Sequence, residues 1–209
     1  MSEQKSRPMV GTSLDVAVSS LRRGGIVAFP TETCYGLAVD PDCALAVERL
    51  FSLKKRAAEN PLLLLIEKKE QLASVVQNVP RLYWPLIEKY WPGPLTLIFP
   101  ALPSLSRRIT GNTGTVGIRI SPHPIAQELV KRMGKPITAT SANISGFPPA
   151  RSAPEIVKMF GESIDYIIDG GATEAELCST ILGLQKGQLS LVRHGQIDLS
   201  KEIGGGKII

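Results

Sequence analysis

The stretch Ile26-Val-Ala-Phe-Pro-Thr31-Glu-Thr-Cys-Tyr35-Gly-Leu37 changes in its middle from apolar residues to a cluster of hydroxyl-bearing ones. Gly24 and Gly25 precede the apolar run and Pro30 closes it, so the pattern predicts a short buried strand. The side chains of residues 31–35 follow where that strand ends. Because α/β proteins build binding sites at strand ends, this loop is a candidate site, with an ordinary threonine-rich turn as the alternative.

The composition is that of a globular chain with a real core, since 43% of its 209 residues are apolar. We expect a flexible N-terminal tail over residues 1–11 and a single domain over residues 12–209. Lysine and arginine number 24 against 19 aspartates and glutamates, an excess of five positive charges. This excess favours an anionic ligand.

The sequence predicts a cytoplasmic protein. It has no apolar stretch near the ~20 residues that a membrane span needs, and its N-terminus lacks a signal-peptide core. Cys34, Cys43 and Cys178 form no Cys-x-x-Cys pair, which is typical of a reducing compartment and argues against a zinc site or a disulfide framework. His123 and His194 are the only histidines, too few for a histidine-rich metal cage.

Helical spacing and helix-capping residues alternate along the chain with short apolar runs. We expect an α/β (α+β) fold, an open, twisted, mixed sheet with flanking helices, because the C-terminal strands follow one another closely. The predicted helical segments run from Leu14 to Leu21 and over 41–53, 69–77, 80–90 and 124–133, with another starting at Ser152. The predicted strands cover 26–30, 62–66, 95–99, 115–120, 137–140, 165–168, 180–183 and 189–193.

Polar residues also follow other predicted strands or flank them. Ser141-Ala-Asn143 comes directly after the strand 137–140, which repeats the design of the first loop. Cys178-Ser179-Thr180 and Arg193-His194-Gly195 show the same pattern at strand ends. These segments are further candidates for one shared site.

Cations gather in Lys54-Lys-Arg56-Ala-Ala-Glu-Asn60-Pro61, between a predicted helix and a strand. They form either an anion site or a solvated helix end. Within Thr115-Val-Gly-Ile-Arg119-Ile120, alternation places Arg119 on the face opposite three apolar side chains. A guanidinium there binds either an acidic side chain or an anionic ligand.

Several common site motifs are missing from the sequence. The run Gly204-Gly-Gly-Lys207 is not a P-loop, because no serine or threonine follows the lysine and no helix is predicted after it. Neither a G-x-S-x-G elbow nor an H-E-x-x-H motif is present.

Seven segments together, in this order, resemble the YrdC-like family of threonylcarbamoyl-AMP synthases, over roughly Gly24 to Gly195. The resemblance implies an open, twisted α/β sheet around a concave basic cavity. It also implies that L-threonine, bicarbonate and ATP give threonylcarbamoyl-AMP and pyrophosphate, for synthesis of N6-threonylcarbamoyladenosine in tRNA. The segments are FPTETCYGLAVD, KKRAAENPLLLLI, WPGPLTLIFPA, TVGIRISPHPIA, PITATSANISG, CSTI and LVRHG.

The resemblance also implies roles for single residues. It implies that Mg²⁺ arrives with ATP and pyrophosphate rather than in a protein cage, and that tRNA or a tRNA-modification transferase is a partner. The implied catalytic set is Lys54, Arg56, Ser141 and Asn143. The implied L-threonine contacts are Thr33, Arg119, Ala139 and Ser179. The implied ATP contacts are Arg56, Asn60, Thr115, Ser141 and Arg193.

Two departures from the family pattern accompany the resemblance. Leu65 stands where some relatives carry a histidine near the threonine, so that contact is lost or replaced. The sequence ends soon after Arg193, so we expect no gating by the extra C-terminal domain of the longer family branch.

Two other functions fit parts of the sequence. A non-catalytic RNA-binding module would use the same basic concavity for a phosphate backbone. A sugar-phosphate enzyme in the manner of the dihydroxybutanone-phosphate synthases would need acidic metal ligands, for which the first loop offers Glu32 alone.

Overall fold

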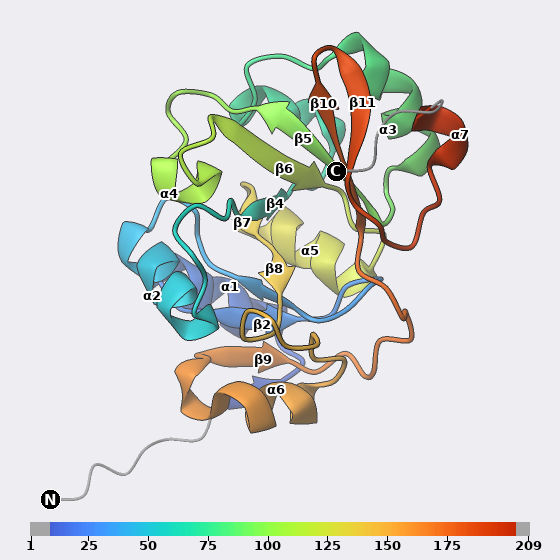
Figure 1. Ribbon diagram of the computed structural model, residues 1–209. Coiled ribbons are helices and arrows are strands. Elements are labelled where there is room, and N and C mark those ends of the chain that lie inside the picture. Colours follow the sequence, from blue (N-terminus) through green and yellow to red (C-terminus); the bar gives the residue numbers. More distant parts are fainter. Residues whose placement is uncertain (1–8, 204–209) are drawn as a thin grey trace, which may run out of the picture.

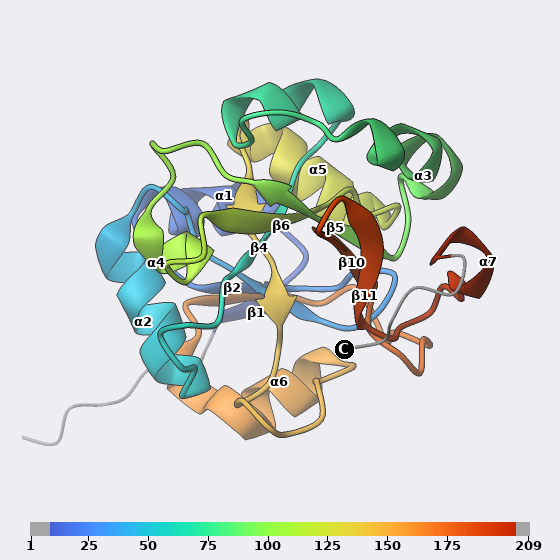
Figure 2. The same cartoon turned by 45° about the horizontal axis from the view of Figure 1, so that its top comes forward.

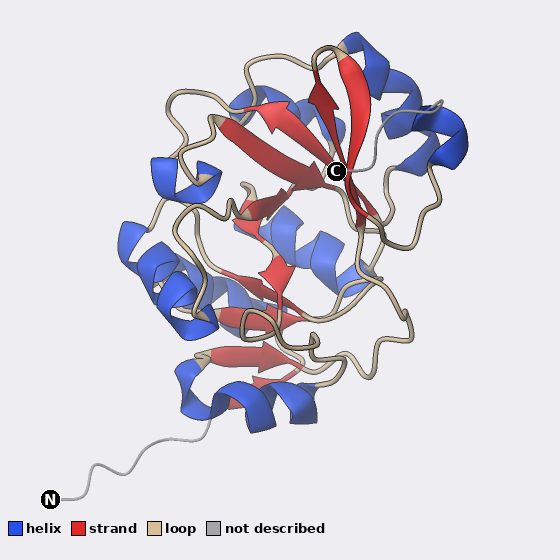
Figure 3. Ribbon diagram, in the orientation of Figure 1, coloured by secondary structure: helices blue, strands red, loops and turns tan. Residues whose placement is uncertain are grey.

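The computed structural model describes residues 9–203 and confirms the predicted α/β class (Figure 3). Residues 1–8 of the expected tail and the run Gly204–Lys207 lie outside the described residues. The strands are β1 (Met9–Gly11), β2 (Val27–Phe29), β3 (Gly36–Ala38), β4 (Leu63–Leu65), β5 (Leu95–Pro100), β6 (Thr115–Arg119), β7 (Ile137–Thr138), β8 (Thr140–Ser141), β9 (Tyr166–Ile168), β10 (Thr180–Gln185) and β11 (Gln188–Arg193). The α-helices are α1 (Leu14–Arg22), α2 (Ala44–Lys54), α3 (Trp84–Tyr90), α4 (Arg107–Thr110), α5 (Pro124–Met133), α6 (Ala153–Phe160) and α7 (Ser200–Ile203), and the 3-10 helices are η1 (Lys69–Ser74), η2 (Arg81–Tyr83) and η3 (Gly161–Ser163).

The described strands form two mixed sheets. A five-stranded sheet has the order β1-β9-β2-β3-β8, and a six-stranded sheet, in the upper part of Figure 1, has the order β11-β10-β5-β6-β4-β7. The predicted strand 137–140 is interrupted at Ala139, because β7 pairs with β4 in one sheet while β8 pairs with β3 in the other. The chain therefore passes from sheet to sheet at the segment that carries Ser141.

Two strands were not predicted. The expected tail over residues 1–11 is wrong for Met9–Gly11, which pairs in parallel with β9 at the edge of the five-stranded sheet. Met9 and Val10 are exposed, so no burial pattern marks this strand in the sequence. The other is β3, which pairs antiparallel with β2, so the candidate loop at residues 31–35 joins two strands of a hairpin.

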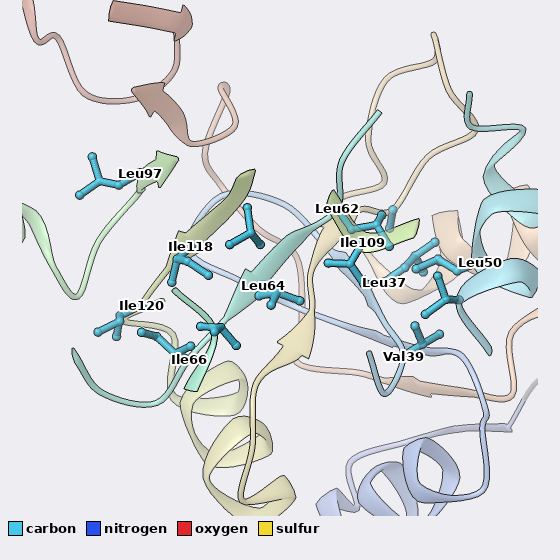
Figure 4. Packing of buried hydrophobic residues seen from close by; sticks show 14 of the residues in the cluster. Leu37, Val39, Leu50, Leu62, Leu64, Ile66, Leu97, Ile109, Ile118 and Ile120 are labelled. Carbon is cyan, nitrogen blue, oxygen red and sulfur yellow. The ribbon is translucent and has the colours of Figure 1, made fainter. Parts of the chain in front are cut away.

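Alternation along β2 sends its side chains into two separate hydrophobic clusters. Ile26, just before the strand, and Ala28 belong to the larger cluster, whereas Val27 and Phe29 belong to a smaller one that includes residues of α1 and α5. Figure 4 shows that the larger cluster brings together residues of both sheets and of α2. Its labelled members are Leu37, Val39, Leu50, Leu62, Leu64, Ile66, Leu97, Ile109, Ile118 and Ile120. The shared core fixes the two sheets against each other.

The helices follow the sequence signals closely where caps are present. The His123 side chain accepts a hydrogen bond from Ile125 N at the start of α5, and Gly134 closes the helix in the left-handed conformation. The helical stretches predicted over 69–77 and 80–90 contain only η1, η2 and the short α3. In the part of the chain described here, no helix has the length and apolarity needed to cross a membrane.

The short helix α4 was not predicted and lies against α2 (Figure 2). Arg108 forms an ion pair with Glu48 at 2.9 Å, and its guanidinium carbon lies 3.9 Å from the centre of the Phe51 ring. Gly111 then closes α4 with φ at 57°. An added Cβ at Gly111 would overlap the carbonyl oxygen of Glu59. This glycine therefore permits the close approach of the connection between α2 and β4.

We predict that Gly111→Ala lowers the free energy of unfolding by about 3 kcal/mol, because left-handed strain adds to a steric overlap with backbone. Gly134→Ala is the matched control, since its φ is 76° but no heavy atom lies within 4 Å of an added Cβ. It should cost only about 1 kcal/mol. Urea denaturation followed by circular dichroism measures both values, and equal losses would contradict the steric contribution.

Candidate active site

A cavity that is open to solvent lies between the two sheets, with walls from both. Gly36 and Ser141 line it from the five-stranded sheet, and Leu63 and Ile181 from the six-stranded one. Seven of the predicted site residues lie in its wall: Thr33, Arg56, Arg119, Ala139, Ser141, Ser179 and Arg193.

The hairpin loop between β2 and β3 is shaped by the hydroxyl of Thr31. This hydroxyl donates to the carbonyl of Cys34 at 2.6 Å and accepts from the backbone N–H groups of Thr33 and Cys34 at 3.2 and 3.3 Å. A side chain thus satisfies backbone groups that β2 and β3 leave unpaired. The loop is tied to itself, and it fixes the buried Thr33 in the cavity wall.

Of the two interpretations that the sequence left open for Arg119, the structure shows the pairing with an acidic side chain, and the ligand role stays a prediction. Nη1 of Arg119 donates to Glu32 Oε1 at 2.6 Å and to Thr33 Oγ1 at 3.3 Å, and the other carboxylate oxygen of Glu32 accepts from Ser121. Within residues 9–203, Nε of Arg119 is buried without a hydrogen-bond partner, although the residue lines the cavity. Glu32 and Thr33 therefore hold the guanidinium through Nη1, while Nε is buried behind it.

Lys54 has a different orientation from the one expected of a phosphate-binding cation. Its ammonium donates to the carbonyl oxygens of Ser141 and Asn143, the latter at 2.7 Å, and to Asn143 Oδ1 at 3.0 Å. These contacts use all three hydrogens of the ammonium. Burial, followed by the positive charge of Arg56, lowers the pKa of Lys54 to about 7. Lys54 therefore holds the loop that presents Ser141, whose hydroxyl donates to Asn143 Oδ1 at 2.6 Å.

Arg56 and Arg193 are held in the cavity wall by backbone carbonyl oxygens. Arg56 donates to the carbonyls of Asn60 and Pro61 at 3.2 and 2.7 Å. Arg193 donates to the carbonyl of Ser179 at 2.9 Å and to its hydroxyl at 3.0 Å. Burial lowers the pKa of both arginines, and the charge of Arg193 lowers that of Arg56 further.

Among the described residues, Lys54, Arg56 and Arg193 have no carboxylate within ion-pair distance. Their charges are stabilised by carbonyl oxygens and, for Arg193, also by the hydroxyl of Ser179. At ~4 Å and an effective dielectric of 20, two like charges repel by about 4 kcal/mol. The excess of positive charge in the wall therefore favours an anionic ligand.

Lys54 and Asn143, two of the predicted catalytic residues, lie behind Ser141 and are absent from the cavity wall. Three further residues singled out in the sequence are absent from it too. The side chain of Asn60 is exposed, and its carbonyl serves to hold Arg56. Thr115 Oγ1 lies 2.8 Å from Thr113 Oγ1, and Thr115 lines a separate hollow beside β10 and β11. Leu65 is buried in the smaller cluster, whereas Leu63 lines the cavity. The ATP contacts at Asn60 and Thr115 stay predictions.

Sequence reasoning missed two features of the wall. Glu32 was considered only as a metal ligand. Its pairing with Arg119 could have been expected, because it is adjacent in sequence to Thr33, which was predicted to share a site with Arg119. Cys34 and Cys178 were read only as evidence for a reducing compartment, yet both line the cavity. Cys34 and Cys178 are 144 residues apart, and no local sequence pattern predicts that such distant residues meet.

The fold and the cavity define an α/β protein of two mixed sheets with a cation-lined binding site between them. The model of the Sua5/YciO/YrdC family, described as "Telomere recombination", matches residues 19–195. This chain belongs to that family.

Curated relatives carry one functional name. The threonylcarbamoyl-AMP synthase of Pyrococcus abyssi is 40% identical over 186 residues, which cover 89% of this chain and 55% of that protein. The threonylcarbamoyl-AMP synthase of Photobacterium profundum is 37% identical over 76% of this chain and 86% of its own length. The chain thus spans little more than half of the first relative and most of the second.

Solved structures agree with the fold. P. abyssi Sua5 complexed with L-threonine superposes with a TM-score of 0.88 at 38% identity, over 94% of this chain and 60% of that one. YciO of E. coli superposes with a TM-score of 0.81 at 24% identity, over 93% of this chain and 97% of that one, a likeness of fold alone.

We predict that Lys54→Met lowers the free energy of unfolding by about 3 kcal/mol, because the oxygens of Ser141 and Asn143 lose charged donors. Lys55→Met is the matched control, since Lys55 is the adjacent, exposed lysine, and it should change stability by less than about 0.5 kcal/mol. Chemical denaturation of both variants checks this. Equal effects would show that Lys54 does not hold the loop.

Proposed function

We propose that this chain is an L-threonylcarbamoyladenylate synthase, a nucleotidyltransferase that makes threonylcarbamoyl-AMP and pyrophosphate from L-threonine, bicarbonate and ATP. The main observation in support is the guanidinium of Arg119, held by Glu32, in one cavity wall with Arg56 and Arg193, which have no carboxylate partner among the described residues. A ligand carboxylate would match Arg119, and a polyphosphate would match Arg56 and Arg193. The names of the relatives at 37–40% identity point the same way.

The threonine carboxylate would bind the guanidinium of Arg119 where this residue lines the cavity, beside Thr33 and near Ser179 and Ala139 in the same wall. The Glu32 contact fixes the guanidinium in advance, which limits the ordering entropy lost on binding. Hydroxyl groups of Thr33 and Ser179 are available for the polar groups of the amino acid. Ala139 and Leu63 supply apolar surface for its methyl group.

The phosphates of ATP would lie against Arg56 and Arg193, beside Ser141 on the loop that Lys54 holds. A phosphate beside Arg56 offsets the repulsion between the two arginines and favours the charged form of Lys54. Asn143 shares this loop, so Lys54 and Asn143 act as positioning residues for Ser141.

In the proposed reaction the threonine amine adds to bicarbonate, and loss of water leaves a carbamate. A carbamate oxygen then forms a bond to the α-phosphorus of ATP, and the bond to pyrophosphate breaks. The protein contributes alignment and neutralisation of charge, which carry most of such a transfer. The cations that hold the phosphates also stabilise the departing pyrophosphate.

Mg²⁺ would enter with ATP and leave with pyrophosphate. The described residues contain no group of three or more histidine, cysteine, aspartate or glutamate side chains placed to hold a metal ion. Glu32, the acidic residue beside Thr33, is already occupied by Arg119 and Ser121. The side chains present do not fit a protein-held magnesium site, so its ligands would come from the phosphates.

The product would serve the formation of N6-threonylcarbamoyladenosine in tRNA. A cytoplasmic location supplies ATP and bicarbonate and keeps the three cysteines reduced. The partner would be tRNA or the transferase that passes the threonylcarbamoyl group to it.

We predict that pyrophosphate release from ATP requires both L-threonine and bicarbonate. Arg56→Ala should lower kcat/KM for ATP by about a hundredfold, because it removes a fixed charge from the phosphate site. Arg81→Ala, at an exposed arginine of η2, is the control and should leave the rate unchanged. A coupled pyrophosphate assay with each substrate omitted in turn gives the answer. Release that ignores threonine, or no turnover together with salt-sensitive RNA binding, would reject the proposal.

We predict that Arg119→Lys raises KM for L-threonine by about tenfold or more while KM for ATP changes little. Lysine keeps a positive charge for Glu32 but lacks the planar edge that binds a carboxylate in two places. Steady-state kinetics with each substrate varied separates the two constants. Equal changes in both would remove Arg119 from the threonine site.

A further inference from the structure

Two cysteines that are 144 residues apart in sequence meet in the wall of the cavity. Cys34 belongs to the hairpin loop between β2 and β3, and Cys178 to the connection that leads into β10. Their Sγ atoms are 3.7 Å apart. Both are free thiols, and the function proposed above uses neither of them.

The surroundings of the pair shift the pKa values of the two thiols in opposite directions. The hydrogen bond from Cys34, followed by the positive charges of Arg193, Arg119 and Lys54, lowers the pKa of Cys178 to about 6. The same hydrogen bond, together with burial, raises the pKa of Cys34. Glu32 adds little opposing charge because it is paired with Arg119. At neutral pH the pair is therefore a Cys178 thiolate that accepts a hydrogen bond from a Cys34 thiol.

We propose that Cys34 and Cys178 are an oxidation site for hydroperoxides, at which a disulfide forms across the cavity wall and blocks it. The Cys178 thiolate attacks one peroxide oxygen, the O–O bond breaks, and Cys178 becomes a sulfenic acid while hydroxide leaves and takes a proton from solvent. Sγ of Cys34 then attacks the Cys178 sulfur. The S–O bond breaks, an S–S bond forms, and the Cys34 proton leaves with the oxygen as water. Two thiols lose two electrons, and one peroxide becomes two waters.

The geometry favours this second step over further oxidation of a single sulfur. A disulfide has its sulfurs about 2.05 Å apart, so the two atoms need to approach by about 1.7 Å. Both cysteines lie outside helices and strands, on the 30–35 loop and the 169–179 connection, where backbone shifts of this size break no helix or sheet hydrogen bonds. Cys43, the third cysteine, lies at the start of α2 and is absent from the cavity wall.

The disulfide would act on the substrate site through sequence neighbours. Cys34 follows Thr33 and Cys178 precedes Ser179, the two hydroxyl residues expected to contact L-threonine. Drawing the sulfurs together moves both hydroxyls and fills part of the cavity. Formation of the disulfide is independent of the proposed function, whereas its effect on threonine binding and turnover rests on that function.

We predict that the purified protein, treated with hydrogen peroxide at pH 7, loses the mass of two hydrogen atoms and yields one linked peptide pair that contains Cys34 and Cys178. Dithiothreitol should reverse the change. Cys43→Ser is the control and should give the same link. Cys34→Ser should stop at a sulfenic acid on Cys178 that dimedone traps, and Cys178→Ser should form no disulfide within the chain. A link through Cys43, a dimer, or no link under these conditions would overturn the proposal.

The pH dependence gives a second, separate measurement. Because the thiolate is the reactive form, alkylation of Cys178 by iodoacetamide should rise with pH through about 6 and level off above about 7. Between pH 7 and pH 5 its rate should fall about tenfold. Cys34→Ala removes the hydrogen bond that lowers the pKa most, so it should shift this profile to higher pH. A profile that this variant leaves unchanged would show that the two thiols do not interact.

Activity completes the test. Oxidised protein should lose about tenfold or more of its threonine-dependent pyrophosphate release, and L-threonine should slow disulfide formation by occupying the cavity. If the disulfide forms but the protein shows no turnover even when reduced, the proposed function fails and the oxidation site stands. If turnover is normal and peroxide produces no Cys34–Cys178 link, the oxidation site fails alone.

Discussion

The arrangement of this molecule depends on how one short segment, residues 137–141, satisfies its backbone hydrogen bonds while it passes from one sheet to the other. β7 and β8 are each two residues long, and the peptide groups between them fit neither sheet completely. Ala139 N donates to the carbonyl oxygen of Leu63 at 2.8 Å, and Val39 N donates to Thr138 Oγ1 at 2.8 Å. The ammonium of Lys54 donates to the carbonyl oxygen of Ser141. Burying a lysine in an apolar core is costly, but Lys54 donates hydrogen bonds to carbonyl oxygens that no neighbouring strand pairs with.

The cavity lies where the two sheets meet. The chain crosses between the sheets at β3–β4, β7–β8 and β9–β10, and strand ends and loops line the cavity. The wall is rich in cations because three different segments each contribute an arginine to it. Arg56 follows α2, Arg119 ends β6, and Arg193 ends β11. Carbonyl oxygens, rather than carboxylates, hold Arg56 and Arg193, so the wall keeps a positive potential that is available to anions. The hydrogen bond from Cys34, together with these positive charges, lowers the pKa of Cys178.

Much of the fold was predictable because the chain is locally consistent. The apolar runs of β2, β4 and β6 and the caps of α5 carry their own signals. Strands without such signals were missed: β1 exposes Met9 and Val10, and β3 consists of one leucine between glycine and alanine, which are weak strand formers. For the site, spacing and alternation found Arg119, and the family resemblance assigned Thr33, Ser141 and Ser179. Asn60 and Thr115 came from the same resemblance, yet their side chains lie outside the wall, since sequence position does not fix side-chain direction.

The sequence by itself determined the class of fold, the order of the strand-end loops and the excess of positive charge. These properties depend on residues that are close in sequence or on composition. They can therefore be predicted from hydrophobic periodicity, turn residues and the number of charges. Only the tertiary structure decided that the strands divide into two sheets, that Lys54 faces backbone oxygens, that Glu32 pairs with one side of Arg119, and that two distant thiols meet. Each of these depends on which segments become neighbours in space, and that is settled by the burial of a shared core, not by any local pattern.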